Sequence, residues 1–171
     1  MDYLMNTRLD MGKVLDRLDR LSPWAFTGIL YILRWMVIIP LAFVLTLFTT
    51  SSQAVEFQGA PLGLFIGFIF LAPLGETLIE CALPYWVMLK FNKIPLGKRP
   101  WLFVAISAGI MALLHIEAWP LALPPSLMTG AFLAYTYAHF APRGFGRALL
   151  HTSLFHAAIN IIGWFLIVGS M

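Results

Sequence analysis

Five stretches of the chain are nearly continuous runs of apolar residues, and the segments between them carry most of the charged and turn-forming residues. The runs are Trp24–Thr50, Pro61–Lys90, Trp101–Trp119, Leu123–Ala141 and Arg147–Val168. A helix needs about 20 residues to cross the hydrocarbon core of a bilayer, and each run reaches or approaches that length. The pattern predicts an all-α polytopic membrane protein with five transmembrane helices, forming one domain over residues 24–171.

The segment before the first run has a different pattern. Residues 1–23 are mostly polar, with apolar residues recurring among alternating acidic and basic side chains. The apolar positions are Leu4, Val14, Leu15, Leu18 and Leu21. This spacing favours an amphipathic helix on the membrane surface that ends at Ser22-Pro23. A solvated helix with mixed ion pairs fits the same residues.

The composition agrees with a membrane environment. Of the 171 residues, 60% are hydrophobic and 11% are charged, whereas soluble domains average about half apolar and a quarter charged. The net charge of +3 is too small to indicate a nucleic-acid partner. One cysteine, Cys81, excludes an intrachain disulfide and a cysteine-cluster metal site. The N-terminus lacks the basic patch and short apolar core of a signal peptide, so we expect no cleavage there.

The distribution of lysine and arginine predicts the orientation. Four of these residues precede the first run, four lie in residues 90–99, and two are Arg143 and Arg147, whereas residues 51–60 and 117–125 have none. Short basic loops stay in the cytoplasm. We therefore expect an integral, multi-pass protein of a bacterial or archaeal inner membrane, with its N-terminus in the cytoplasm and its C-terminus outside.

Two rows of small residues repeat every four positions. The first is Gly59, Gly63 and Gly67, and the second is Gly130, Ala134 and Ala138. Such rows let helices approach closely. We interpret both as packing features. Arg34, near the start of the first run, is expected to extend to the cytoplasmic headgroups.

The runs also contain polar residues that lipid cannot satisfy. Glu76 and Glu80 lie one helical turn apart in the second run, His115 lies in the third, and His156 and Asn160 are one turn apart in the fifth. An ionisable side chain at mid-membrane costs about 2.5 kcal/mol or more. These groups must therefore face one another or a wet cavity.

Three functions fit such a cluster. It can join the helices through hydrogen bonds. It can form a proton or ion path, although the chain shows no inverted repeat of the kind found in transporters. It can also catalyse hydrolysis, because a carboxylate in an apolar pocket can serve as a base while imidazole and amide groups hold an oxyanion.

The motifs around these residues resemble those of the CPBP family, the CAAX-protease and bacteriocin-processing (Abi) membrane proteins. The similar parts are residues 72–76 (Ala-Pro-Leu-Gly-Glu), His115, and residues 156–160 (His-Ala-Ala-Ile-Asn). The family signature is Glu-Glu-x-x-x-Arg, then Phe-x-x-x-His, then His-x-x-x-Asn. Order and spacing agree, and the resemblance covers roughly residues 61–168, the family-like core.

The resemblance implies an intramembrane glutamic endopeptidase that cleaves membrane-associated peptides, either prenylated or carrying a leader. Glu76 would activate a water molecule, His115 and His156 would orient water or substrate, and Asn160 would contribute to the oxyanion hole. Metal dependence has been proposed for relatives. The chain has no His-Glu-x-x-His string, so we expect no metal and no other cofactor. The expected partners are membrane lipid and a membrane-bound peptide or protein.

The chain departs from the first two motifs. Thr77 occupies the second glutamate position, Cys81 the arginine position and Met111 the aromatic position. Glu80 is an additional acid that can partly replace the missing glutamate. These departures leave an alternative open, in which the chain is a non-catalytic CPBP-like protein that serves as a binding, scaffold or regulatory subunit of a membrane complex.

Overall fold

The described part of the chain consists of helices and their connections, without a β-strand. The computed structural model describes residues 17, 20–47, 61–92, 100–116 and 123–168. The helices are α2 (Pro23–Leu47), α3 (Pro61–Ile66), η1 (Gly67–Leu71), α4 (Ala72–Thr77), η2 (Leu78–Ala82), α5 (Leu83–Asn92), α6 (Pro100–Leu114), α7 (Leu123–Phe140), η5 (Ala141–Arg143) and α8 (Phe145–Val168). The surface helix expected before Ser22 lies almost entirely outside the described residues.

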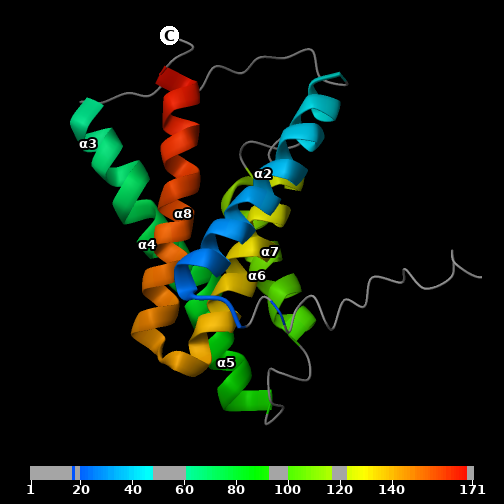
Figure 1. Cartoon of the computed structure of the whole chain (residues 1–171), viewed down its shortest axis with the longest axis vertical. Coiled ribbons are helices and arrows are strands. Elements are labelled where there is room, and N and C mark those ends of the chain that lie inside the picture. Colours follow the sequence, from blue (N-terminus) through cyan, green and yellow to red (C-terminus); the bar gives the residue numbers. More distant parts are fainter. Residues whose placement is uncertain (1–16, 18–19, 48–60, 93–99, 117–122, 169–171) are drawn as a thin grey trace, which may run out of the picture.

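Residues 61–92 form one continuous helical rod that contains two π-helical turns, η1 and η2 (Figure 1). In η1 the N–H of Ala72 bonds the carbonyl of Gly67, five residues back, and in η2 Leu83 bonds Leu78 in the same way. A proline follows each of these donors, Pro73 and Pro84. Proline has no N–H to donate, which interrupts the regular ladder. Such turns often occur at functional sites, and Glu76 lies between the two.

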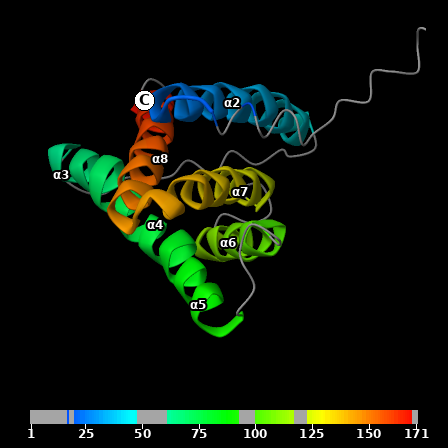
Figure 2. The ribbon, with the colours of Figure 1, turned by 60° about the horizontal axis from the view of Figure 1, so that its bottom comes forward.

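Helix α7 is the centre of the bundle and contacts α2, α6 and α8 (Figure 2). Helix α8 in turn packs on α4 and η1 of the rod. A Cβ atom added at Gly130 of α7 would lie 2.7 Å from Met111 Cβ and 2.8 Å from Ala108 Cα on α6, so glycine permits this close approach. The corresponding space at Gly63 and Gly67 is open. Only the second predicted row of small residues therefore meets a neighbouring helix among the described residues.

Three helical segments are long and apolar enough to cross a membrane: Pro23–Leu41, Gly67–Phe91 and Phe145–Phe165. Among the described residues, α6 has only 15 residues. Helix α7 has 18 residues, but its serine, threonine, tyrosine and histidine side chains lower its apolar character. The all-α fold is thus confirmed, and three of the five predicted spans meet the criteria of length and composition.

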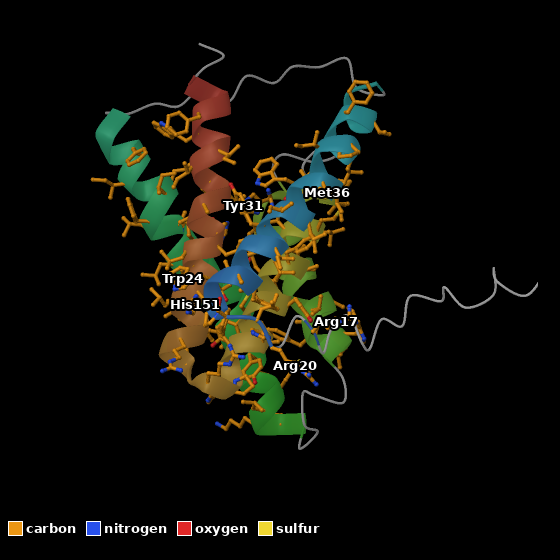
Figure 3. All side chains as sticks on the ribbon, in the orientation of Figure 1. Arg17, Arg20, Trp24, Tyr31, Met36 and His151 are labelled. Atoms are coloured by element: carbon orange, nitrogen blue, oxygen red, sulfur yellow. The ribbon has the colours of Figure 1, made fainter. Side chains whose placement is uncertain are left out.

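The basic residues gather at one end of the bundle. Arg17 and Arg20 lie beside the start of α2 at the lower end (Figure 3). Lys90 is in the last turn of α5, Arg143 is in η5, and α8 begins just before Arg147; these ends lie at the same lower side (Figure 1). Apart from Arg34, every described lysine and arginine is at this end.

A hydrogen bond and ring contacts hold α2 against α8. The Tyr31 hydroxyl donates a hydrogen bond to the Ala158 carbonyl at 3.1 Å. Nearer the lower end, Trp24 meets His151 edge to face, with ring centroids 5.2 Å apart (Figure 3). Helix α2 is therefore joined to the helix that carries His156 and Asn160.

Candidate active site

The carboxylate of Glu76 meets the imidazole of His156. Glu76 lies on α4 and His156 on α8, and these helices pack together. Their Oε2 and Nε2 atoms are 3.3 Å apart, and the side chains are 26% and 2% exposed, respectively. The imidazole is thus almost entirely enclosed, whereas part of the carboxylate remains accessible. Glu76 is thus the member of the pair that solvent can reach.

Glu80 occupies the other side of the same imidazole. Its Oε1 atom is 4.0 Å from Nδ1 of His156, and its side chain is 0% exposed. Neither Glu80 oxygen has a hydrogen-bond partner among the described residues. His156 therefore lies between two carboxyl groups, but it is within hydrogen-bonding distance of only one. Its Nε2–H tautomer would donate to Glu76.

His115 is held by its own helix. Its Nδ1 atom is 2.9 Å from the Met111 carbonyl oxygen. A carbonyl only accepts hydrogen bonds, so Nδ1 must carry the proton, and a neutral ring then has its free lone pair on Nε2. The ring is near enough to Glu76 and His156 to interact with both electrostatically. Neutral His115 is therefore suited to accept a hydrogen bond from water, and it would need a second proton to donate one to an oxyanion.

Asn160 interacts with the backbone of the rod. Its Nδ2 atom donates to the Phe68 carbonyl at 2.8 Å. The two nearest helical donors do not serve this carbonyl, because Ala72 bonds Gly67 and residue 73 is a proline. The asparagine amide thus replaces a missing backbone N–H and fixes α8 against η1. This contact uses one of its two amide hydrogens.

Arg34 lies in a different place from the one that the sequence predicted. The expectation that it extends to the headgroups is not met, since the side chain is 6% exposed and its Nη2 donates to Thr129 Oγ1 at 3.1 Å. It is close enough to His156 for electrostatic interaction. The available signal was an arginine flanked on both sides by apolar residues, at a depth where such residues usually have a function.

The residues that depart from the CPBP motifs are buried. Thr77 and Cys81 are both 0% exposed, and Met111 is 4% exposed, against Gly130. Cys81 belongs to the apolar core and supplies no charge where the family motif has an arginine. Arg34 on α2 is a guanidinium close enough to His156 for electrostatic interaction.

No three histidine, cysteine, aspartate or glutamate side chains of the described residues are grouped so that they could hold a metal ion. Comparison of the chain with protein-family models, curated proteins and solved structures finds no match. A partly accessible carboxylate 3.3 Å from a buried imidazole can take a proton from water in an apolar setting.

Proposed function

We propose that the chain is an intramembrane endopeptidase of the glutamate type, similar to the CPBP family, that hydrolyses a peptide bond of a membrane-associated peptide. Glu76 accepts a proton from a water molecule, whose oxygen bonds to the peptide carbonyl carbon. The C–N bond then breaks, and the leaving amine takes the proton from Glu76. His156 orients the carboxylate, and His115 holds the water through its free Nε2. The observation that supports this proposal most directly is the 3.3 Å pair formed by partly accessible Glu76 and enclosed His156.

The membrane arrangement belongs to the same proposal. Helices α6 and α7 would complete five spans, with the basic end of the bundle in the cytoplasm and the C-terminus outside. Glu76 is the tenth residue of the 25-residue segment Gly67–Phe91. The reaction would therefore occur within the apolar layer, at a depth that only membrane-bound substrates reach.

The test is a cleavage assay with the purified protein reconstituted into liposomes. The probes are two quenched fluorescent peptides, one prenylated near its C-terminus and one with an apolar leader. We expect Glu76→Gln to lower the rate by about 100-fold or more, because the amide cannot accept the proton. Glu80→Gln is the matched control, since this buried carboxyl lies one turn away without access to water. We expect its rate to fall by less than about 10-fold.

A second function rests on the buried Thr77 and Cys81 at motif positions. In this alternative the chain is a non-catalytic subunit that binds a membrane protein through the same helices. Equal rates for Glu76→Gln and the unmodified protein would favour this alternative and contradict the peptidase proposal. So would replacement of Glu76, His115 and His156 without loss of biological function, provided that the variants fold.

A further inference from the structure

Arg34 is a buried cation whose donors are mostly unused. A guanidinium has five N–H groups that donate hydrogen bonds, and it has no acceptor atom. Nη2 bonds the Thr129 hydroxyl, but Nε and Nη1 have no partner in the described part of the chain. The neighbouring Trp35, whose ring lies 4.5 Å from the guanidinium carbon, also has a buried N–H without a partner. These unsatisfied donors call for an acceptor, because burying a charge without a partner is costly.

The described part of the chain supplies no carboxylate to Arg34. The described carboxyl groups are Glu76 and Glu80, and the ion pairs that they form are with His156. Arg34 and His156 each lie eleven residues beyond the start of their candidate spans at Pro23 and Phe145. This is about 17 Å along a helix axis, which is deeper than the layer of lipid headgroups at the end of a span. No described carboxylate satisfies these donors, and a molecule that enters the site could supply the acceptor.

We infer that Arg34 binds a carboxylate of the peptide that occupies the site, close to the bond that Glu76 and His156 address. This inference rests on the proposed function, because it treats the bound molecule as a peptide. Arginine favours carboxylates, whose planar geometry its donors match. The carboxylate is either the peptide's C-terminus or an acidic side chain. A negative group that leaves water for this pocket exchanges its hydration for the unsatisfied N–H donors.

Binding is measured in maltoside micelles with the Glu76→Gln protein, so that no probe is hydrolysed. The first two probes are N-lauroyl-Ala-Leu-Ala-Leu with a free C-terminal carboxylate and the same peptide with a C-terminal amide. The third is N-lauroyl-Ala-Glu-Ala-Leu with a C-terminal amide. We expect one carboxylate peptide to bind about 10-fold or more tightly than the neutral amide, corresponding to 1.4 kcal/mol. The carboxylate peptide that binds more tightly shows whether the site recognises a C-terminus or an acidic side chain.

The Arg34→Gln change, added to Glu76→Gln, should abolish this preference for carboxylate peptides. Arg34→Lys should retain part of the preference, because lysine keeps the positive charge but lacks the planar set of N–H donors. Thr129→Val, which removes only the neutral partner, should leave the preference in place. Equal affinity for all three peptides would overturn the inference, as would a preference that persists in folded Arg34→Gln. If Arg34→Gln does not fold, the carboxylate preference of the Arg34→Lys protein is compared with that of the Glu76→Gln protein. A preference that Arg34→Lys does not reduce would overturn the inference.

The two proposals fail separately. A carboxylate preference without any cleavage by the protein that retains Glu76 would overturn the peptidase and leave the Arg34 site standing. Cleavage of acid and amide peptides at equal rates, with equal affinities, would overturn the Arg34 site and leave the peptidase standing.

Discussion

At the residue scale, the imidazole of His156 interacts differently with Glu76 and with Glu80. Glu76 and Glu80 are separated by a single helical turn, yet His156 is 3.3 Å from the first and 4.0 Å from the second. The first is partly accessible and the second fully enclosed. Environments that differ in this way give chemically identical groups different roles. Glu76 is placed to exchange protons with water, and Glu80 is placed to act on His156.

Asn160 matches a catalytic position of the CPBP motif, and it also stabilises the contact between two helices. Its amide donates a hydrogen bond to the Phe68 carbonyl, to which Pro73 cannot donate because it has no N–H. We expect Asn160→Ala to lower the free energy of unfolding by about 1–3 kcal/mol, because the Phe68 carbonyl loses its hydrogen-bond donor. Pro73→Ala restores a backbone N–H, so the same asparagine change in that background should cost less than about 0.5 kcal/mol. Chemical unfolding in micelles measures both values.

Pro84→Ala is the control for this cycle, since it restores an N–H near the other π turn and should not rescue Asn160→Ala. Cleavage rates separate the two roles of the amide. We expect the Pro73→Ala, Asn160→Ala protein to cleave within about 10-fold of Pro73→Ala alone. A rate that stays 100-fold lower in a stable protein would instead show direct contact between Asn160 and the reacting group.

At the element scale, the spacing of apolar and polar residues was enough to predict that the rod, α2 and α8 are helices and that Glu76 and Glu80 share a face. It could not predict the two π turns, because these depend on which carbonyls lose donors to Pro73 and Pro84 and on which side chains of α8 compensate. Nor could it place Arg34. An arginine ten residues into a span can extend to the interface or turn inward, and Thr129, on another helix, decides between the two.

The contact between α6 and α7 depends on Gly130. We expect Gly130→Ala to destabilise the bundle by about 1–3 kcal/mol, because the new methyl group would lie 2.7 Å from Met111 Cβ and force the helices apart. Gly109→Ala, on α6 with open space around it, is the matched control. It should be neutral or stabilising, since alanine is the better helix former. Thermal unfolding in micelles distinguishes the two, and equal effects would contradict the role given to Gly130.

Gly130→Ala should also affect the site. Met111 supplies both the contact to Gly130 and the carbonyl that fixes the His115 ring. A shift of α6 therefore moves His115 relative to Glu76. The cleavage rate should fall further than the loss of folded protein explains, and this excess is absent if His115 has no part in the reaction.

At the scale of the whole molecule, polar and charged groups are sorted by depth. The described basic residues other than Arg34 lie at one end of the bundle, and Glu76, Glu80 and His156 lie within the candidate spans. This sorting follows from the cost of charge in hydrocarbon. A charge at the end of a span can stay hydrated, whereas one inside a span depends on neighbouring groups. The sequence revealed the basic end directly, because positions in short loops need no knowledge of packing.

The orientation of the bundle gives a prediction that does not depend on catalysis. Cys81 is the chain's one cysteine and is buried, so the unmodified protein should react little with a maleimide. Arg143→Cys places a thiol at the basic end, and Gly63→Cys places one in α3, which begins at the opposite end (Figure 1). A membrane-impermeant maleimide added to intact cells should label the Gly63 variant and should label the Arg143 variant only after disruption, because basic ends remain in the cytoplasm. The reverse pattern would invert the orientation, and equal labelling of both thiols in intact cells would mean that no membrane separates the two ends.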